Sequence, residues 1–133
     1  MNINSSFSRY DSNGNVIYSE SICKEGNKVH HFYKYNENGR RIWYKKETLS
    51  KDSSICELYE EEITYNTDGT KTITSISVPE YIMKKTIYSK YGRLEYERIK
   101  KELTGEIIYK SYNQYTGKYD IHKSISPLLY INE

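Results

Sequence analysis

Apolar and polar side chains alternate along several short segments of this chain, which is the pattern of half-buried β-strands. Near the C-terminal end, Tyr119 and Ile121 fall on one side of such a segment, while Asp120 and His122 fall on the other. Elsewhere, as in residues 41–44, bulky groups fall on both sides. This mixture predicts a twisted β-sheet whose second face is partly covered from solvent.

Between these segments one short signature recurs, in which a Tyr is followed four residues later by a Gly. Four copies share this spacing and a fifth is one residue longer: Tyr10–Gly14, Tyr35–Gly39, Tyr65–Gly69, Tyr88–Gly92 and Tyr112–Gly117. The residues between are rich in Asn and Asp, which tolerate positive φ, while Gly adopts it without steric cost, so each copy predicts a tight hairpin turn. We expect Gly14, Gly39, Gly69 and Gly92 to have positive φ.

A second family of turn signals lies between the copies, at residues 24–27, 50–53, 78–80 and 103–106. Together the two families divide the chain into about ten expected strands: 6–10, 15–23, 28–36, 40–49, 54–66, 70–78, 81–89, 93–102, 106–113 and 118–125. Short connections predict an antiparallel meander of repeated hairpins, strongly twisted and closing as an open barrel or a sandwich. We expect one domain over residues 1–133, with residues 126–133 as a tail that folds back over an open end or edge.

Composition supports an all-β chain. The 133 residues include sixteen Tyr and not one Ala, so strand formers are enriched and the best helix former is missing. The formal net charge of +2 is too small to indicate a polyanionic partner by itself. The N-terminal residues have neither a basic start nor an apolar run, and no segment has the apolar length of a membrane span, so we predict a cytoplasmic protein without a membrane partner.

The hairpin units resemble the YD repeats of bacterial RHS and teneurin-type proteins, and more loosely the repeats of YwqK-like antitoxin proteins. The resemblance covers roughly residues 7–125 and depends on aromatic strands punctuated by Asn/Asp-rich turns ending in Gly. Only Tyr10-Asp11 is a true Tyr-Asp pair, because later copies have Tyr-Asn or Tyr-Ser. The resemblance implies a bacterial protein related to polymorphic toxins, among which small cytoplasmic proteins act as immunity partners.

Candidate catalytic and metal-binding groups are few. His30 and His31 are adjacent on an expected strand, so their rings point to opposite faces and cannot share one metal ion. Cys23 near either histidine lacks the turn and oxyanion loop that nucleophilic catalysis requires. We therefore predict no catalytic residues, no metal and no cofactor, and a protein that is not an enzyme.

Two charged regions are candidates for partner binding. Glu57, Glu60, Glu61 and Glu62 form the densest acidic run, which serves either as a solvated strand rim or as a patch that docks a basic surface. The other region combines Arg40 and Arg41 with Trp43 and Tyr44, residue types that dominate interface energetics.

The leading hypothesis is an immunity protein that binds a cognate bacterial toxin domain and occludes it. Its predicted contact residues are Arg40, Arg41, Trp43, Tyr44, Glu57, Glu60, Glu61 and Glu62. The alternative is a module that binds single-stranded nucleic acid or a glycan on its aromatic sheet face. Nucleic acid is disfavoured because glutamates such as Glu47 and Glu95 cancel much of the basic field. The oligomeric state and the binding face are left open.

Overall fold

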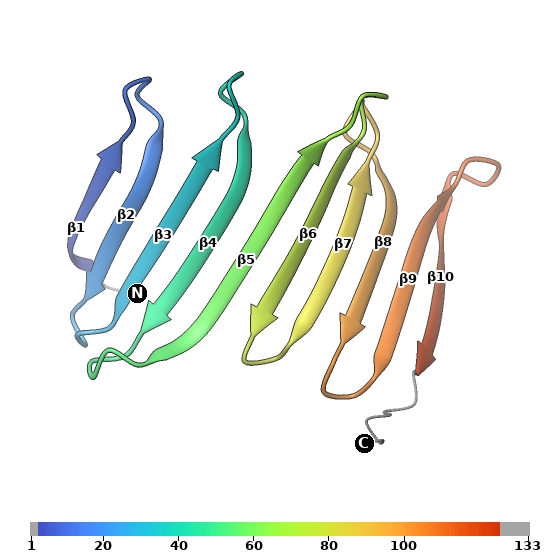
Figure 1. Ribbon diagram of the computed structural model, residues 1–133. Coiled ribbons are helices and arrows are strands. Elements are labelled where there is room, and N and C mark those ends of the chain that lie inside the picture. Colours follow the sequence, from blue (N-terminus) through green and yellow to red (C-terminus); the bar gives the residue numbers. More distant parts are fainter. Residues whose placement is uncertain (1–2, 126–133) are drawn as a thin grey trace, which may run out of the picture. The chain divides into compact units, whose positions relative to one another are not determined.

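The computed structural model describes residues 3–125, and in that range every regular element is a β-strand (Figure 1). The first five strands are β1 (Ile3–Tyr10), β2 (Val16–Cys23), β3 (Lys28–Tyr35), β4 (Arg41–Leu49) and β5 (Ile55–Tyr65). The other five are β6 (Lys71–Val78), β7 (Ile82–Tyr88), β8 (Leu94–Lys101), β9 (Glu106–Asn113) and β10 (Lys118–Ile125). The expected tail, residues 126–133, lies outside the described residues.

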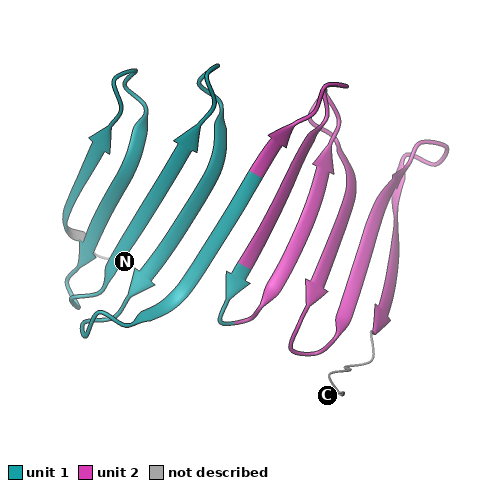
Figure 2. Ribbon diagram, in the orientation of Figure 1, with its two compact units in different colours: residues 1–62, 77–79 teal, residues 63–76, 80–133 magenta. Residues whose placement is uncertain are grey.

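The strand order follows the chain order from β1 to β10 in one sheet, which confirms the antiparallel meander. Because β1 and β10 occupy the two ends of this order, the sheet is open and is not closed into a barrel. The strands group into two compact units, namely residues 1–62 with 77–79, and residues 63–76 with 80–133 (Figure 2). Each unit is described below by itself.

The hairpin turns have the backbone conformation that the repeated signature predicts. The φ angles of Gly14, Gly39, Gly69 and Gly92 are 85°, 81°, 88° and 88°. In the turn after β3, the Asn36 carbonyl accepts a hydrogen bond from the Gly39 amide at 3.0 Å, and the Asn36 side chain accepts two more, from the amides of Asn38 and Arg40. Asn36 thus holds the turn with both its backbone and its side chain, as the first residue of an Asx turn does.

Full burial is rare in this protein. Among the side chains that the structure describes, the buried apolar ones are Cys23, Val29 and Ile63, and the buried polar ones are Glu61 and Thr86. Most other strand residues are half-buried, on both faces of their strands. Packing between neighbouring strands, more than a closed core, therefore shields the apolar surface. Tyr suits this arrangement because its ring packs while its hydroxyl stays in contact with water or a partner.

Candidate functional site

Strands β1 to β5 of the first unit present two faces of different chemistry. Residues directly opposite each other in the register lie on the same face, and each strand alternates between the faces. The rows Arg9–Tyr18–Phe32–Lys45–Glu60 and Phe7–Glu20–His30–Glu47–Leu58 therefore share one face, called here the Tyr18 face. The row Ser19–His31–Lys46–Tyr59 lies on the opposite face, called here the Tyr44 face, which also carries Tyr33, Tyr44 and Glu61.

Aromatic rings cluster at the β1 side of the Tyr18 face. The ring of Tyr18 lies 5.7 Å from that of Phe7 and 5.2 Å from that of Phe32, and both pairs are tilted. The Arg9 guanidinium lies over Phe7 and Tyr18, at 5.9 and 5.7 Å from the ring centroids. The Lys45 ammonium lies 5.7 Å from the ring of Phe32. Cations above these rings add cation–π attraction to the packing of the cluster.

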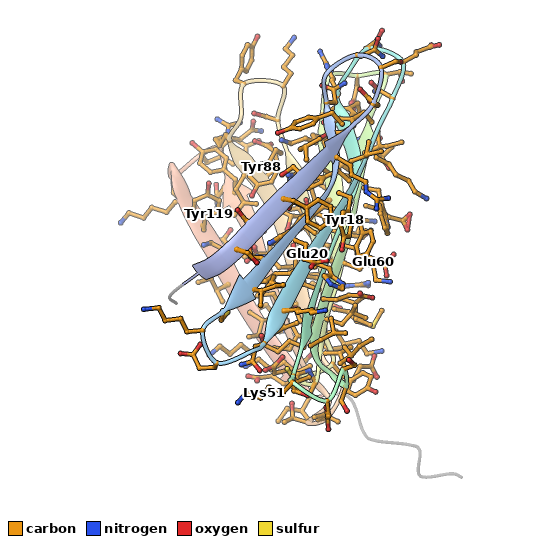
Figure 3. The ribbon with its side chains drawn as sticks, turned by 90° about the vertical axis from the view of Figure 1, so that its left-hand side faces the viewer. Tyr18, Glu20, Lys51, Glu60, Tyr88 and Tyr119 are labelled. Carbon is orange, nitrogen blue, oxygen red and sulfur yellow. The ribbon has the colours of Figure 1, made fainter. Side chains whose placement is uncertain are left out.

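A chain of carboxylates, one histidine and one lysine crosses the same face from β2 to β4. The two ring nitrogens of His30 lie 3.5 Å from a Glu20 oxygen and 3.6 Å from a Glu47 oxygen, and Lys45 pairs with Glu47 at 3.2 Å. The Tyr18 hydroxyl donates to Glu20 at 2.9 Å. Burial of the Tyr18 ring, together with this bond to Glu20, raises the pKa of its phenol. These mutual contacts hold the aromatic cluster in one arrangement (Tyr18, Glu20 and Glu60 are labelled in Figure 3).

Trp43 occupies the far end of the Tyr18 face. Its indole N–H donates to a Glu60 oxygen at 2.8 Å, across the pairing of β4 with β5. The Lys34 ammonium lies 4.7 Å from the centre of the Trp43 ring. Glu62 stands directly opposite Trp43 and is exposed. This end thus combines an anchored aromatic ring with exposed charges of both signs, Lys34 and Glu62.

A hollow of about 540 Å³ opens beside the edge strand β1. Its walls are three aromatic rings, one aliphatic side chain and a pair of opposite charges, supplied by Phe7, Arg9, Ile17, Tyr18, Glu20 and Phe32. Phe7 is 46% exposed although it touches Tyr18, so its ring forms an accessible apolar wall. An apolar hollow flanked by an arginine and a glutamate has the chemistry of a pocket that receives an anchor side chain of a partner protein.

The Tyr44 face is organised around a second aromatic cluster. His31 Nδ1 lies 2.7 Å from the Tyr44 hydroxyl, and the Tyr44 ring packs against those of Tyr33 and Tyr59 at 5.2 and 6.1 Å. Burial raises the pKa of the Tyr44 phenol. Glu61 is buried here and accepts hydrogen bonds from Tyr59 at 2.6 Å and from Arg41 at 3.0 Å. The hydroxyls of Tyr44 and Tyr59 and the carboxylate of Glu61 therefore have polar partners within the sheet.

Acid is expected to destabilise the protein through His31. Burial lowers the pKa of His31, and the charges of Lys46 and His30 lower it further. Because the folded protein then binds this proton less readily than the unfolded chain does, the stabilising contribution is fully present above the ordinary histidine pKa of about 6.5. It is lost as the pH falls from there through the lower pKa of the folded protein. The groups facing His31 are Ser19, Tyr33, Tyr44 and Lys46, none of them an anion that would offset this loss.

The measurement is urea unfolding at pH 5 and pH 7.5, paired with an NMR titration of the His31 ring. His31→Gln should reduce the loss of stability on acidification, since glutamine does not titrate. His30→Gln is the matched control, because His30 is the neighbouring histidine and lies between Glu20 and Glu47 on the other face. A His31 ring that titrates above the ordinary range would contradict this prediction.

The structure divides the predicted contact residues between the two faces. Trp43, Glu60 and Glu62 belong to the Tyr18 face, whereas Arg41, Tyr44, Glu57 and Glu61 belong to the Tyr44 face. Arg40 lies in the turn before β4. The basic-aromatic and acidic segments also bind each other, through Trp43 with Glu60 and Arg41 with Glu61. One flat partner surface can thus contact only part of the predicted set.

Sequence reasoning did not identify Phe7, Arg9, Tyr18 and Phe32 as site residues. The alternation of side chains along a strand already indicates that Phe7 and Arg9, two residues apart in β1, lie on the same face. The pairing of β1 with β2 and of β2 with β3 is what brings the four side chains together. Which side chains meet is therefore decided by the interstrand register and not by the sequence of any one strand.

Comparisons with protein-family models, with curated proteins and with solved structures give no match to this chain. The resemblance to YD repeats therefore stays a prediction. Within residues 3–125, no group of three or more His, Cys, Asp or Glu side chains is arranged to hold a metal ion. No helix in this range is long and apolar enough to cross a membrane.

Proposed function

We propose that this chain is a cytoplasmic immunity protein that binds a cognate toxin domain with the Tyr18 face of its first unit and so occludes that domain. The observation that carries the proposal is the aromatic hollow beside β1, with Arg9 over two of its rings. Tyr, Trp and Arg are the residues most often found at the energetic centres of protein interfaces.

The side chains of the Tyr18 face are preorganised in the unbound protein. Ring contacts, the Glu20–His30–Glu47 chain and the bond from Trp43 to Glu60 already hold its side chains in place. Binding therefore orders few new rotamers, which reduces the entropic cost of association. A preorganised and partly exposed face favours recognition of one folded partner.

The charges on this face indicate the kind of partner surface. Four cations (Arg9, Lys28, Lys34 and Lys45) are interspersed with four carboxylates (Glu20, Glu47, Glu60 and Glu62). Such a balanced surface complements a toxin surface of mixed charge, in which each cation meets a carboxylate. A uniformly basic or uniformly acidic partner would leave half of these charges facing like charges.

The assignment to toxin immunity, as distinct from other protein binding, rests on the resemblance of the Tyr-x-x-x-Gly hairpins to YD and YwqK-like repeats. The proposed immunity function can be tested by examining the neighbouring genes and by a growth assay in cells. A large toxin gene is expected immediately upstream of the gene for this chain. Expression of the C-terminal domain of that toxin should arrest growth, co-expression of this chain should restore it, and the two proteins should co-purify.

Point variants locate the contact. Phe7→Ala and Trp43→Ala should each weaken the complex by about tenfold, because each removes an aromatic anchor from the Tyr18 face. Tyr91→Ala, which removes an even more exposed ring from the second unit, should leave affinity unchanged. Circular dichroism checks that each variant is folded. If Phe7→Ala and Tyr91→Ala bind the toxin domain equally well, the Tyr18 face is not the contact surface. If the wild-type chain fails to protect cells from the toxin domain, the immunity function itself is rejected.

A further inference from the structure

The second unit contains a polar hollow of about 430 Å³ that the proposed function does not use. It lies where β8 begins and where the turn between β9 and β10 leaves the sheet. It is lined by Arg93, Glu95, Tyr112, Asn113, Gln114, Tyr115 and Asp120. The register places the side chains of Glu95 and Tyr112 on one face of the sheet, with Arg93 over the Tyr112 ring, and the side chain of Asp120 on the other face. This volume falls within the range of small-molecule sites, about 300–1,000 Å³.

The lining chemistry is unusual for such a hollow. Five of its seven residues have planar polar groups, namely one guanidinium, two carboxylates and two amides, and the other two are tyrosines. No aliphatic side chain lines it. Sites for drug-like ligands are lined mainly by apolar groups, so this hollow suits a ligand that is itself covered with hydrogen-bonding groups.

Most of these polar groups are held in position by one another. Arg93 Nε donates to Glu95 at 2.7 Å, and the guanidinium lies 4.0 Å from the centre of the Tyr112 ring. The Asn113 amide donates to Asp120 at 3.1 Å. Tyr112 is supported from β10 by Tyr119 at 5.4 Å (Tyr119 is labelled in Figure 3). A site with this support is preorganised for binding.

Tyr115 is the accessible aromatic ring of the hollow. It is 91% exposed, so its ring contributes almost nothing to the packing of the fold. The turn does not require it either: Asn113 closes this turn by accepting the amides of Tyr115, Thr116 and Gly117. A large ring at a turn tip, with neither a packing role nor a turn role, is a surface against which a ligand can stack.

We propose that this hollow binds a saccharide. Sugar hydroxyls can donate to the carboxylate of Glu95 while they accept from the Arg93 guanidinium and the Gln114 amide, so both kinds of lining group are used. The apolar C–H face of a sugar ring packs against the electron-rich face of Tyr115. A phosphate-bearing ligand fits less well, because Arg93 is already paired with the Glu95 carboxylate.

The test is an NMR titration of the ¹⁵N-labelled full chain with cellobiose, lactose, N,N′-diacetylchitobiose and methyl α-D-mannoside, and separately with oligo-dT. At least one sugar should shift the amides of residues 113–116 and of Asp120 in a saturable way. Tyr115→Ala should weaken that binding by about tenfold through the lost ring. Glu95→Gln should weaken it as well, because a charged acceptor is removed.

Tyr91→Ala is the matched control, since Tyr91 is also exposed (86%) at a hairpin tip of the same unit but does not line the hollow. It should leave sugar binding unchanged. Three results would overturn the proposal: no saturable shift with any of the four sugars, equal binding by Tyr115→Ala and the wild-type chain, or shifts of the hollow residues with oligo-dT alone. None of these results bears on the Tyr18 face, so the proposed function is judged separately.

Discussion

Replacing Ile63 with alanine is expected to lower the free energy of unfolding by about 2–4 kcal/mol, the range found for buried Ile→Ala changes. Ile63 is only 8% exposed and is one of three buried apolar side chains in the described part of the chain. The change removes three buried carbon atoms and leaves a void that neighbouring strands cannot fully close. Since most other strand residues are only half-buried, few other side chains remove as much apolar surface from water as Ile63 does.

Urea unfolding followed by circular dichroism measures this effect, and the chain provides a control of the same residue type. Ile121 in β10 is 62% exposed, so Ile121→Ala should change stability by no more than about 0.5 kcal/mol. A clear difference between the two variants supports the burial pattern. Equal destabilisation would show that Ile63 has no special role in packing.

Replacing Gly39 with valine should destabilise the protein by about 1–2 kcal/mol, because a β-branched residue is forced into the left-handed region. The φ of Gly39 is 81°, and an added Cβ would have no atom within 4 Å. The penalty therefore comes from the backbone of the turn and not from a steric clash. Thermal unfolding of the variant provides the measurement.

Gly39→Asn is the control for this prediction. Asparagine tolerates the left-handed region, so Gly39→Asn should lower the stability of the protein clearly less than Gly39→Val does. Gly69→Val should destabilise the protein at least as much as Gly39→Val, because the added Cβ would also lie 2.9 Å from the Cβ of Lys90, an atom fixed by the backbone. Unchanged melting temperatures in both valine variants would refute the role of these glycines in the turns.

The strands and turns were predictable because their signals are local. The observed bounds of β9 and β10 are the predicted ones, and those of β2 to β8 differ by one residue at most ends. Five consecutive residues contain all the groups that make a turn such as 36–40, so no distant contact is needed to form it. Only β1, which begins at Ile3, extends well beyond its prediction.

The candidate sites were less predictable because they combine strands. Trp43 was expected to contact a partner together with Tyr44, yet neighbours in a strand point to opposite faces. The register then places Trp43 opposite Glu62 and Tyr44 opposite Glu61. The hollow in the second unit likewise needs Arg93 and Tyr112, which are far apart in the sequence, to meet at 4.0 Å.

By itself the sequence determined that this protein is an antiparallel β-meander with tight turns at its repeated glycines. Asn, Asp and Gly select turn conformations within a few residues, and the alternation of side chains selects strands. The tertiary structure alone decided which faces the side chains share, that the sheet stays open, and where the aromatic and polar hollows form. The physical reason is the period of two in a strand: the interstrand register, including irregularities such as that at Lys34/Tyr35, decides which side chains meet.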